Sequence, residues 1–322
     1  MKYIRFLGDK KIVVENAPMP VPAAGEVLVK IMRCALCGSD FKLYNKGQNF
    51  IGGHEPIGVV EQPGHPLHGK RFFVYIPVGC GECAECATGN DQLCQQATLI
   101  GWNRDGAYAE YAAVPEKILL PIPDDISDDL APLLLDAVST PAHGVELAER
   151  VLKQRGSVLI LGAGVIGLGA LIVCKDRGYT DITVSEPQPK RQDTARRLGA
   201  NIRTSGDMSK RFDLVLECSG NLKARQEAIE IVSSGGAVVL LGENDQPWCM
   251  EENKIVRRKD FYMIRSFYFS RADIVKNADI LRRNADVYRS FVDAQFSFDD
   301  FARNFALFAA GDLIKPFFKP EG

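Results

Sequence analysis

The hydrophobic pattern changes in character part-way along the chain. In the first part, apolar residues come in short runs that alternate with polar ones, at residues 2–7, 11–15 and 27–31. Such runs are typical of half-buried β-strands. Further on, residues 158–161 form a continuous apolar run that a helical segment follows, which is typical of a parallel strand buried on both faces. We therefore expect an all-β region followed by a region of alternating strands and helices.

A glycine-rich turn joins this buried strand to its helix. The helix ends near Gly178, and the next strand, residues 181–186, ends in Glu186. Strand, glycine turn, helix, strand and acid in this order predict a dinucleotide-binding unit, in which the pyrophosphate lies at the helix N-terminus. The residues expected to contact the cofactor are Gly162, Gly164, Val165, Ile166 and Gly167.

The acid at the end of the second strand bears on the choice of cofactor. The Glu186 carboxylate can accept hydrogen bonds from the ribose hydroxyls and repels a 2′-phosphate, so it predicts NAD rather than NADP. Lys190 and Arg191 follow closely, and their positive charges could instead favour NADP, although a solvated helix start explains them too. We keep Arg191 as a candidate cofactor contact.

Composition excludes some classes of protein. The 322 residues suffice for two domains, and 46% hydrophobic and 25% charged residues are ordinary for a globular chain. A net charge of −2 provides no basic field for nucleic acid or acidic membranes. Residues 156–174 lack charge over nearly a bilayer-spanning length, but the glycine turn explains them as a buried strand and helix. The expectation is a cytoplasmic protein with neither membrane nor nucleic acid as a partner.

Four of the nine cysteines fall between residues 80 and 94, with the spacing C-x2-C-x2-C-x7-C. Four thiolates this close together suit a closed, tetrahedral, structural zinc site. Disulfides fit poorly, because C-x2-C pairs close very small loops and nothing else in the chain suggests secretion. The predicted ligands are Cys80, Cys83, Cys86 and Cys94.

A second group of candidate ligands lies upstream. Cys34 and Cys37 form a C-x2-C pair, which alone could be a redox pair or two buried thiols. His54 and Glu55 follow in a Gly-His-Glu motif. A thiolate, an imidazole and a carboxylate together suit a catalytic zinc site with an open position.

The order of these motifs resembles the zinc-dependent medium-chain dehydrogenase/reductase (alcohol dehydrogenase) family, closest to its sorbitol, butanediol and threonine dehydrogenase branch. The resemblance covers essentially the whole chain. It implies an α/β fold with a GroES-like, mostly-β catalytic domain, residues 1–139 and 280–322, and a Rossmann doubly wound parallel-sheet domain, residues 140–279. It also implies an active site between the domains, two zinc ions per subunit, and a homodimer or homotetramer.

The resemblance also implies roles for individual residues. Cys37 would be the thiolate ligand of the catalytic zinc, His54 its imidazole ligand, and Glu55 a further ligand or a close carboxylate that exchanges with water. Ser39 would sit beside the substrate oxygen and pass its proton towards solvent. Asp40 would orient a ligand from behind.

Other positions match the family less closely. Asp136 stands where the branch usually has glutamate as a final zinc carboxylate, bound directly or through water, but Asp is one methylene shorter. A helix-capping aspartate before Ser139 is the alternative. His143 is expected to be a packed residue on the following helix, and Cys34 a cysteine that the family does not use as a ligand.

The expected reaction is the reversible oxidation of a secondary alcohol to its ketone. The intervals 40–54 and 61–80 look short for the family, which suggests an open pocket and favours a polyol, sugar alcohol, cyclitol or aminocyclitol. Threonine, a short diol or a sugar phosphate are alternatives in the same chemistry. A more distant alternative is a non-catalytic protein that binds zinc and nucleotide.

Basic and aromatic residues alternate between residues 257 and 269. This composition can mean nucleic acid, and a phosphate-bearing substrate would suit it as well. The stretch falls where the family has a strand used in subunit pairing, so a structural or dimer-interface role is the interpretation we adopt.

Overall fold

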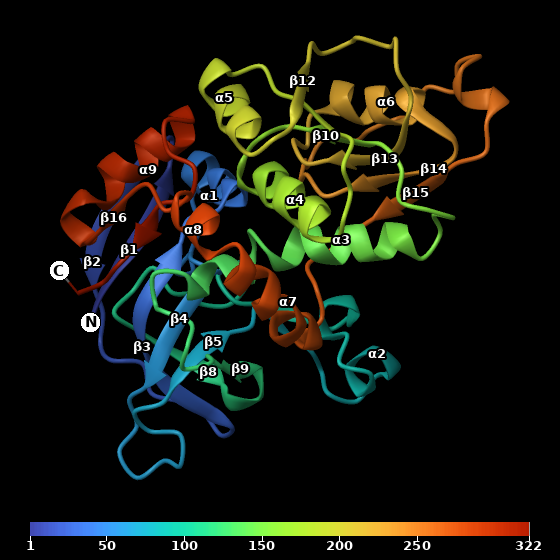
Figure 1. Cartoon of the computed structure of the whole chain (residues 1–322). Coiled ribbons are helices and arrows are strands. Elements are labelled where there is room, and N and C mark those ends of the chain that lie inside the picture. The colour runs from blue at the N-terminus through green and yellow to red at the C-terminus, as the bar shows by residue number, and fades with distance from the viewer. Residues whose placement is uncertain (322) are drawn as a thin grey trace. The chain divides into compact units, whose positions relative to one another are not determined.

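The computed structural model describes residues 1–321 and divides the chain into two compact units (Figure 1). The first is formed by Met1–Leu135 with Ser270–Gly322, and the second by Asp136–Phe269. The second unit thus begins at 136 and ends at 269, where the sequence predicted 140 and 279. Gly322, the last residue of the predicted catalytic domain, lies outside the described residues.

The first unit is built mainly of β-strands. Its largest sheet has the order β16-β17-β3-β4-β5-β9, with β8 pairing to β3, and two separate pairs are β1-β2 and β6-β7. The strands are β1 (Lys2–Gly8), β2 (Lys11–Asn16), β3 (Glu26–Ala35), β4 (Pro56–Val60), β5 (Arg71–Val74), β6 (Pro77–Val78), β7 (Thr98–Leu99), β8 (Tyr111–Pro115), β9 (Leu119–Pro121), β16 (Gln295–Phe296) and β17 (Phe317–Phe318). The helices are α1 (Phe41–Lys46), α2 (Ala84–Ala87), α7 (Arg271–Arg283), α8 (Ala285–Arg289) and α9 (Phe301–Ala310).

Strand β3 carries the chain from the core to the predicted metal site. Val27, Val29 and Ile31 alternate inward and are at most 2% exposed, as the period-2 pattern predicts. The strand runs on to Ala35, beyond the predicted end at residue 31. It therefore ends two residues before Cys37.

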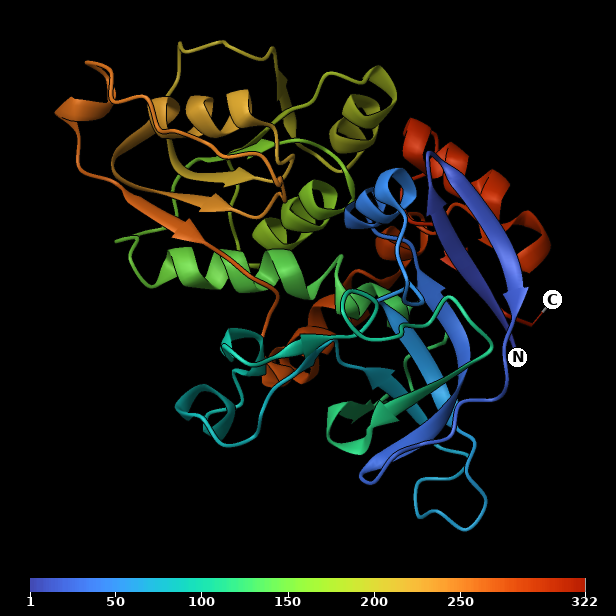
Figure 2. The same cartoon turned by 180° about the vertical axis from the view of Figure 1, so that it is seen from behind.

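The C-terminal segment returns to this strand. β17 pairs antiparallel with β3, with Phe317 opposite Ala35 and Phe318 opposite Cys34. Helix α9 follows β16 and the 3-10 turn Phe298–Asp300. Both views show α9 beside the β1-β2 hairpin (Figures 1 and 2), where the Phe6 ring contacts that of Phe305 at 5.1 Å between centroids. Apolar packing thus fixes the end of the chain against its beginning.

The second unit contains a six-stranded sheet of order β12-β11-β10-β13-β14-β15, in which all neighbours are parallel. Figure 1 shows α3 and α4 on one face and α6 on the other. The strands are β10 (Val158–Leu161), β11 (Ile182–Ser185), β12 (Asn201–Arg203), β13 (Phe212–Glu217), β14 (Val232–Leu240) and β15 (Tyr262–Arg265). The helices are α3 (Ser139–Glu149), α4 (Val165–Asp176), α5 (Pro189–Arg197) and α6 (Leu222–Ile231).

This strand order is that of a doubly wound dinucleotide-binding fold, in which the order reverses beside the first strand, β10. The uncharged run at 156–174 divides into β10 and α4, as predicted. Among residues 1–321, no helix combines the length and apolarity that a membrane crossing needs.

Candidate metal centre and cofactor site

Two neighbouring strands bring the first group of predicted ligands together. Cys37 follows the end of β3, and His54 and Glu55 directly precede β4. Because β3 and β4 are antiparallel, with Cys34 opposite Pro56, the end of one strand lies beside the start of the other. Donor atoms of Cys37, His54 and Glu55 all lie within 4.8 Å of one another. One sulfur, one nitrogen and one oxygen donor at this separation could hold a zinc ion.

A glycine turn presents the histidine. Gly53 has φ +94°, and a Cβ there would lie 2.6 Å from the backbone nitrogen of Tyr108, so only glycine fits. The N–H groups of Gly106 and Tyr108 donate to carbonyls of this turn, at 2.7 and 2.9 Å. These bonds engage the backbone directly before β8, which begins at Tyr111.

Asp40 fixes the orientation of the histidine. Its side chain is fully buried, and Oδ1 lies 3.2 Å from His54 Nδ1. An ionised carboxylate only accepts hydrogen bonds, so an Nδ1–H that faces Asp40 leaves the lone pair on Nε2, on the side of Cys37 and Ser39. The other carboxylate oxygen accepts from the backbone N–H of Cys37 at 3.1 Å. One side chain thereby orients both predicted ligands.

Tyr108 completes this arrangement. Its hydroxyl donates to Asp40 Oδ2 at 2.5 Å, and the whole side chain is buried. Burial first, and then the charge of Asp40, raise the pKa of Tyr108 well above its ordinary value, so the phenol remains a protonated donor.

We expect Tyr108→Phe to lower the zinc affinity of this centre by up to about tenfold, because it removes a hydrogen bond that holds Asp40, and losing a direct partner of a metal ligand typically costs roughly 10–100-fold in metal affinity. Chelator competition on the purified protein measures the effect. Tyr111→Phe, on the neighbouring strand, is the matched control. Unchanged affinity in Tyr108→Phe would show that the phenol does not orient the ligands.

Ser39 lies against the same donor atoms. Its hydroxyl donates to Cys37 Sγ at 3.1 Å and lies 3.4 Å from His54 Nε2. It stands in a 3-10 turn, Gly38–Asp40, that continues into α1. A hydroxyl in this place can exchange a proton with a group bound at the open position of a metal.

Glu55 forms an ion pair with a residue far along the chain. Lys315 Nζ lies 2.7 Å from Glu55 Oε1, and both side chains are fully buried. Sequence reasoning missed both Lys315 and Tyr108. Neither stands in a motif, and a lysine two residues before the last strand, β17, carries no local signal of burial.

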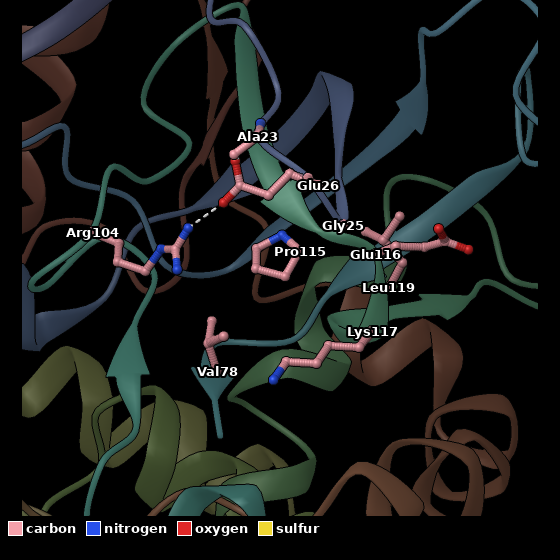
Figure 3. Close-up of a pocket in the computed structure, with 10 residues that line it drawn as sticks. Ala23, Gly25, Glu26, Val78, Arg104, Pro115, Glu116, Lys117 and Leu119 are labelled. Carbon is pink, nitrogen blue, oxygen red and sulfur yellow. Dashed lines mark hydrogen bonds and ion pairs between the residues drawn. The ribbon is translucent and has the colours of Figure 1, made fainter. Parts of the chain in front are cut away.

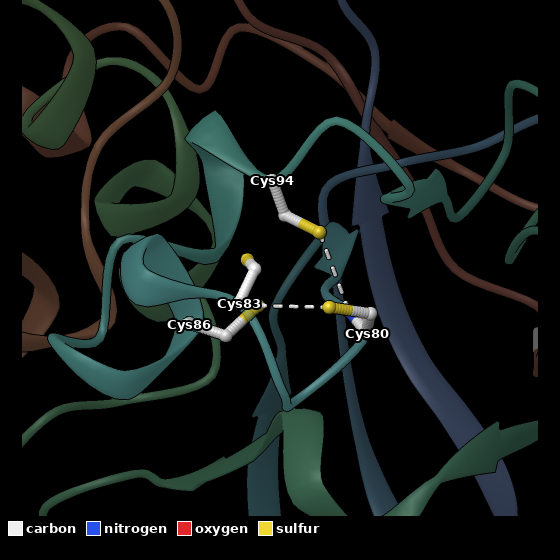
Figure 4. A group of neighbouring side chains, drawn as sticks. All are labelled: Cys80, Cys83, Cys86 and Cys94. Carbon is white, nitrogen blue, oxygen red and sulfur yellow. Dashed lines mark hydrogen bonds between the residues drawn. The ribbon is translucent and has the colours of Figure 1, made fainter.

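The four cysteines of the second group come together as predicted. Their sulfurs lie within 4.8 Å of one another and face a common space (Figure 4). The loop approaches itself closely, because a Cβ at Gly79 would lie 2.5 Å from Cys86 Sγ. Its ends are anchored by β6 and by the 3-10 turn Asp91–Leu93, where Asp91 pairs with Arg271 at 2.6 Å.

The pKa values of two of these thiols are shifted in opposite directions. Backbone N–H groups of Glu82 and Cys83 lower the pKa of Cys80 to about 6. Cys86 receives the N–H of Gly81, which favours its thiolate, yet burial and the neighbouring sulfurs together raise its pKa to about 12. Zinc binds cysteines as thiolates, and a closed set of four sulfur donors within 4.8 Å of one another fits structural zinc.

The sequence also raised three other residues that could be considered as metal ligands: Cys34, Asp136 and His143. Burial raises the pKa of the Cys34 thiol well above its ordinary value, which suits an unligated neutral thiol. Asp136 is the first residue of the second unit, and its Oδ1 accepts from the Thr140 hydroxyl at 3.1 Å. His143 lies on α3, as predicted. The assignment of Asp136 as a zinc ligand stays a prediction.

The glycine turn of the second unit has the predicted form. Gly162 has φ +95°, and a Cβ at Gly167 would lie 1.8 Å from the Gly162 carbonyl oxygen. Gly164 is the N-cap of α4, and Val165 and Ile166 begin the helix. Nothing lies within 4 Å of a Cβ position at Gly164, so the backbone there is open to a ligand. A pyrophosphate fits such a helix start.

Glu186 is placed at the end of β11, beside this turn. It is 7% exposed, and its Oε2 accepts from the backbone N–H of Ala163 at 2.7 Å, while Oε1 accepts from Gln188 at 2.9 Å. Each carboxylate oxygen has a second lone pair, which can accept from a ribose hydroxyl. Arg191 lies in the first turn of α5 and is half-buried.

A cavity of about 780 Å³ in the first unit contains none of the predicted site residues (Figure 3). Its charged groups are engaged within the protein: Arg104 pairs with Glu26, and Lys117 Nζ donates to the Gly79 carbonyl at 2.6 Å. We assign it no ligand. Its lining residues are Ala23, Ala24, Gly25, Glu26, Val78, Arg104, Pro115, Glu116, Lys117 and Leu119.

Comparison with known proteins identifies the family. Residues 23–124 match the alcohol dehydrogenase GroES-like domain, and residues 130–263 match the glucose dehydrogenase C-terminus. The L-threonine 3-dehydrogenase of Chromobacterium violaceum is 32% identical over 269 residues, which cover 76% of this chain and 78% of that protein. The chain belongs to the zinc-dependent medium-chain dehydrogenase family.

Solved structures agree on the fold. Galactitol-1-phosphate dehydrogenase from Escherichia coli aligns with a TM-score of 0.87, at 24% identity, over 99% of this chain and 100% of that one. 2R,3R-butanediol dehydrogenase from Bacillus subtilis aligns with a TM-score of 0.85, at 22% identity and 99% coverage of both chains. The predicted fold class, with a GroES-like and a Rossmann-type unit, is confirmed.

Because the chain belongs to this family of dehydrogenases, it is an enzyme, as predicted. The prediction of zinc and a nicotinamide dinucleotide as cofactors is confirmed as well. The four-cysteine group fits the structural zinc, and Cys37, His54 and Glu55 fit the catalytic one.

Proposed function

We propose that this dehydrogenase oxidises a secondary alcohol to its ketone, with NAD as the hydride acceptor and a polyol, sugar alcohol or cyclitol as substrate. The observation that supports this most directly is the place of the Ser39 hydroxyl. It lies 3.1 Å from Cys37 Sγ and 3.4 Å from His54 Nε2, beside two of the three proposed ligands.

When bound, zinc supplies a Lewis acid and the nicotinamide a hydride acceptor. The chain's own residues place and prepare the reactants. Cys37, His54 and Glu55 are the proposed ligands, and Asp40 holds the first two in orientation. Ser39 takes the proton of the substrate hydroxyl and passes it on towards solvent.

NAD is proposed over NADP because of Glu186. The carboxylate is held at the glycine turn by the backbone N–H groups of Ala163 and Gln188, so it cannot move aside easily for a 2′-phosphate. One structural neighbour was solved with NADH and another with NADP, so the family accommodates both.

Relatives point to a second class of substrate. The threonine dehydrogenases that match this chain, and the galactitol-1-phosphate and L-idonate dehydrogenases among its structural neighbours, are named for substrates that carry an acidic group. Threonine and sugar phosphates therefore remain the alternative within the same chemistry.

The test is cofactor reduction by the zinc-loaded enzyme across a panel of polyols, cyclitols, aminocyclitols, threonine, diols, sugar phosphates and simple alcohols. Each substrate is offered with NAD and with NADP. We expect turnover of one neutral polyhydroxy class with NAD. Turnover confined to threonine or a sugar phosphate would establish the alternative, and a preference for NADP would refute the role given to Glu186. No turnover, with only one zinc ion per chain, would favour a non-catalytic binding protein.

We also propose that the enzyme is a homo-oligomer that pairs through β15. This strand is at one edge of the six-stranded sheet, and Tyr262 and Met263 on it are 48% and 50% exposed. An exposed apolar edge strand is a ready surface for pairing with another chain. Light scattering is expected to give the mass of a dimer or tetramer, and Met263→Lys to lower it. A monomeric wild-type enzyme would refute this proposal.

A further inference from the structure

A half-buried lysine lies against the end of a helix in the second unit. Lys259 Nζ donates to two backbone carbonyls at the C-terminus of α6, that of Glu230 at 2.7 Å and that of Val232 at 2.8 Å. The Phe261 ring lies beside the amine, with 5.7 Å between Nζ and the ring centroid. Lysine usually buries only its carbon chain and keeps the ammonium in water, so the position of this Nζ is unusual.

The backbone on both sides of Lys259 is fixed to the second unit. Val256, three residues earlier, is 5% exposed and belongs to the hydrophobic core of that unit. The carbonyl of Asp260, the next residue, accepts from the N–H of Gly235 in β14 at 2.6 Å. The lysine is therefore held at the end of α6 by packing and backbone bonds.

Neutral carbonyls, rather than a carboxylate, accept the hydrogen bonds of this amine. Glu230 contributes its carbonyl oxygen, while its carboxylate accepts from the side-chain amides of Gln226 and Asn253. A second cation lies close by, because the Arg211 guanidinium donates to the same Glu230 carbonyl oxygen. Two cationic side chains thus share one neutral acceptor, and like charges in such a place repel each other.

These surroundings favour the neutral form of the amine. Burial first, and then the charge of Arg211, lower the pKa of Lys259 to about 8, although the charge of Glu230 acts in the opposite direction. A neutral amine has two N–H donors and one lone pair, and the two carbonyls accept both N–H groups. The lone pair, which makes an amine a nucleophile, is left for a reagent that arrives from solvent.

The charge around Lys259 indicates the kind of reagent. Two exposed arginines, residues 257–258, directly precede the lysine, and Arg211 is exposed as well. The acids at this place are Glu230 and Asp260, so positive charge prevails. A positively charged surface attracts anions from solution, which favours a phosphate-bearing reagent over a neutral one.

We propose that Lys259 is a site of covalent acylation by acyl phosphates, the mixed anhydrides of a carboxylic acid and phosphoric acid. The neutral amine attacks the acyl carbonyl carbon, a C–N bond forms, and the C–O bond to phosphate breaks. Phosphate leaves with the electron pair of that bond, and the amine gives up one proton to water. This inference depends on neither the metal centre nor the substrate of the proposed function.

Acylation changes what holds the end of α6. The product amide has one N–H and no charge, so one of the two carbonyls loses its donor and the helix C-terminus loses a stabilising cation. Lys259→Arg keeps a cation there and cannot be acylated. After the same treatment with acetyl phosphate, we therefore expect the wild-type enzyme to lose more of its unfolding temperature than Lys259→Arg, as measured by calorimetry.

The test is acetylation of the full-length, zinc-loaded enzyme by acetyl phosphate near neutral pH, with the rate at each lysine measured by quantitative mass spectrometry of peptides. Lys210 is the matched internal control: it lies over the Phe212 ring in the same unit but pairs with the Asp181 carboxylate at 2.7 Å. We expect Lys259 to react at least about tenfold faster than Lys210, because the gain in neutral amine exceeds the loss of nucleophilicity that accompanies a lower pKa. The rate at Lys259 should level off above about pH 8, whereas the rate at Lys210 should continue to rise.

A variant of the neighbouring cation shows whether the folded surroundings cause this reactivity. Arg211→Gln removes the nearby charge and should slow acetylation of Lys259 by a few-fold. Arg196→Gln, which changes an exposed arginine on α5, is the matched control and should leave the rate unchanged. In the denatured chain, Lys259 and Lys210 should react at similar rates.

Three results would overturn the proposal: equal rates at Lys259 and Lys210 in the folded enzyme, a rate at Lys259 that keeps rising with pH as that of Lys210 does, or an unchanged rate in Arg211→Gln. None of these readouts requires turnover. Fast acetylation of Lys259 in an enzyme that oxidises no alcohol would refute the proposed function alone. Normal activity with slow acetylation would refute this inference alone.

Discussion

Replacing Cys37 with alanine is expected to abolish turnover while the fold and the four-cysteine zinc remain. The thiolate is the proposed soft ligand of the catalytic metal, and its sulfur lies among the donor atoms of His54 and Glu55. Lewis-acid catalysis by a bound metal contributes several kcal/mol, so its loss should lower kcat/KM by about a thousandfold or more. Metal analysis should find one zinc ion per chain instead of two.

The matched control is Cys34→Ala. Cys34 lies three residues earlier, is fully buried, and has a thiol pKa raised by burial, so it should not ligate zinc. We expect two zinc ions and activity close to that of wild type, with some loss of stability from the missing sulfur. If Cys34→Ala were as inactive as Cys37→Ala, the two cysteines would act as a pair, and the catalytic-zinc assignment would be wrong. Near-normal activity of Cys37→Ala would likewise show that the catalytic-zinc assignment is wrong.

Replacing Cys86 with serine is expected to have the largest effect on stability. The side chain is buried, and its sulfur is one of the four that face the common space of the lobe. A structural zinc ion contributes directly to folding free energy. A loss of about 4 kcal/mol would lower the unfolding temperature by about 6 °C for a chain of this size. Differential scanning calorimetry measures this shift.

Zinc content and a control variant complete this second test. Cys86→Ser should retain only the catalytic zinc, and cofactor reduction by the surviving folded fraction should persist at low temperature. Cys249→Ser removes an exposed cysteine elsewhere and should change neither quantity. An unfolding temperature of Cys86→Ser equal to that of wild type would mean that the lobe does not bind a structural metal.

Motifs whose members are close in sequence were predicted well. The four cysteines fall within fifteen residues, and the chain cannot carry them far apart, so their spacing already indicated one metal site. The glycine turn and Glu186 were also found from the sequence, because a strand, a tight turn and a helix leave few arrangements open. Element boundaries were less accurate: the strand expected at residues 27–31 covers Glu26–Ala35, because its end also pairs with β4 and β17.

Contacts between residues that are far apart along the chain were not predicted. Asp40 was expected to orient a ligand. Only the structure shows that it faces His54, accepts a hydrogen bond from the Cys37 N–H and accepts another from the Tyr108 hydroxyl. Tyr108 stands in none of the motifs that the sequence offered. Nothing local distinguishes a tyrosine that packs from one that donates to a buried carboxylate.

The sequence by itself determined the family and predicted the two classes of metal ligand and the nucleotide turn, since each depends on residue types at short, fixed spacing. Tertiary structure alone decided what surrounds the proposed catalytic metal. Lys315 reaches Glu55 only because β17 pairs with the end of β3, and its burial follows from that pairing. A buried charge needs a nearby opposite charge, and the tertiary fold can supply it from a residue far along the chain. The spacing of neighbouring residues therefore does not predict that partner.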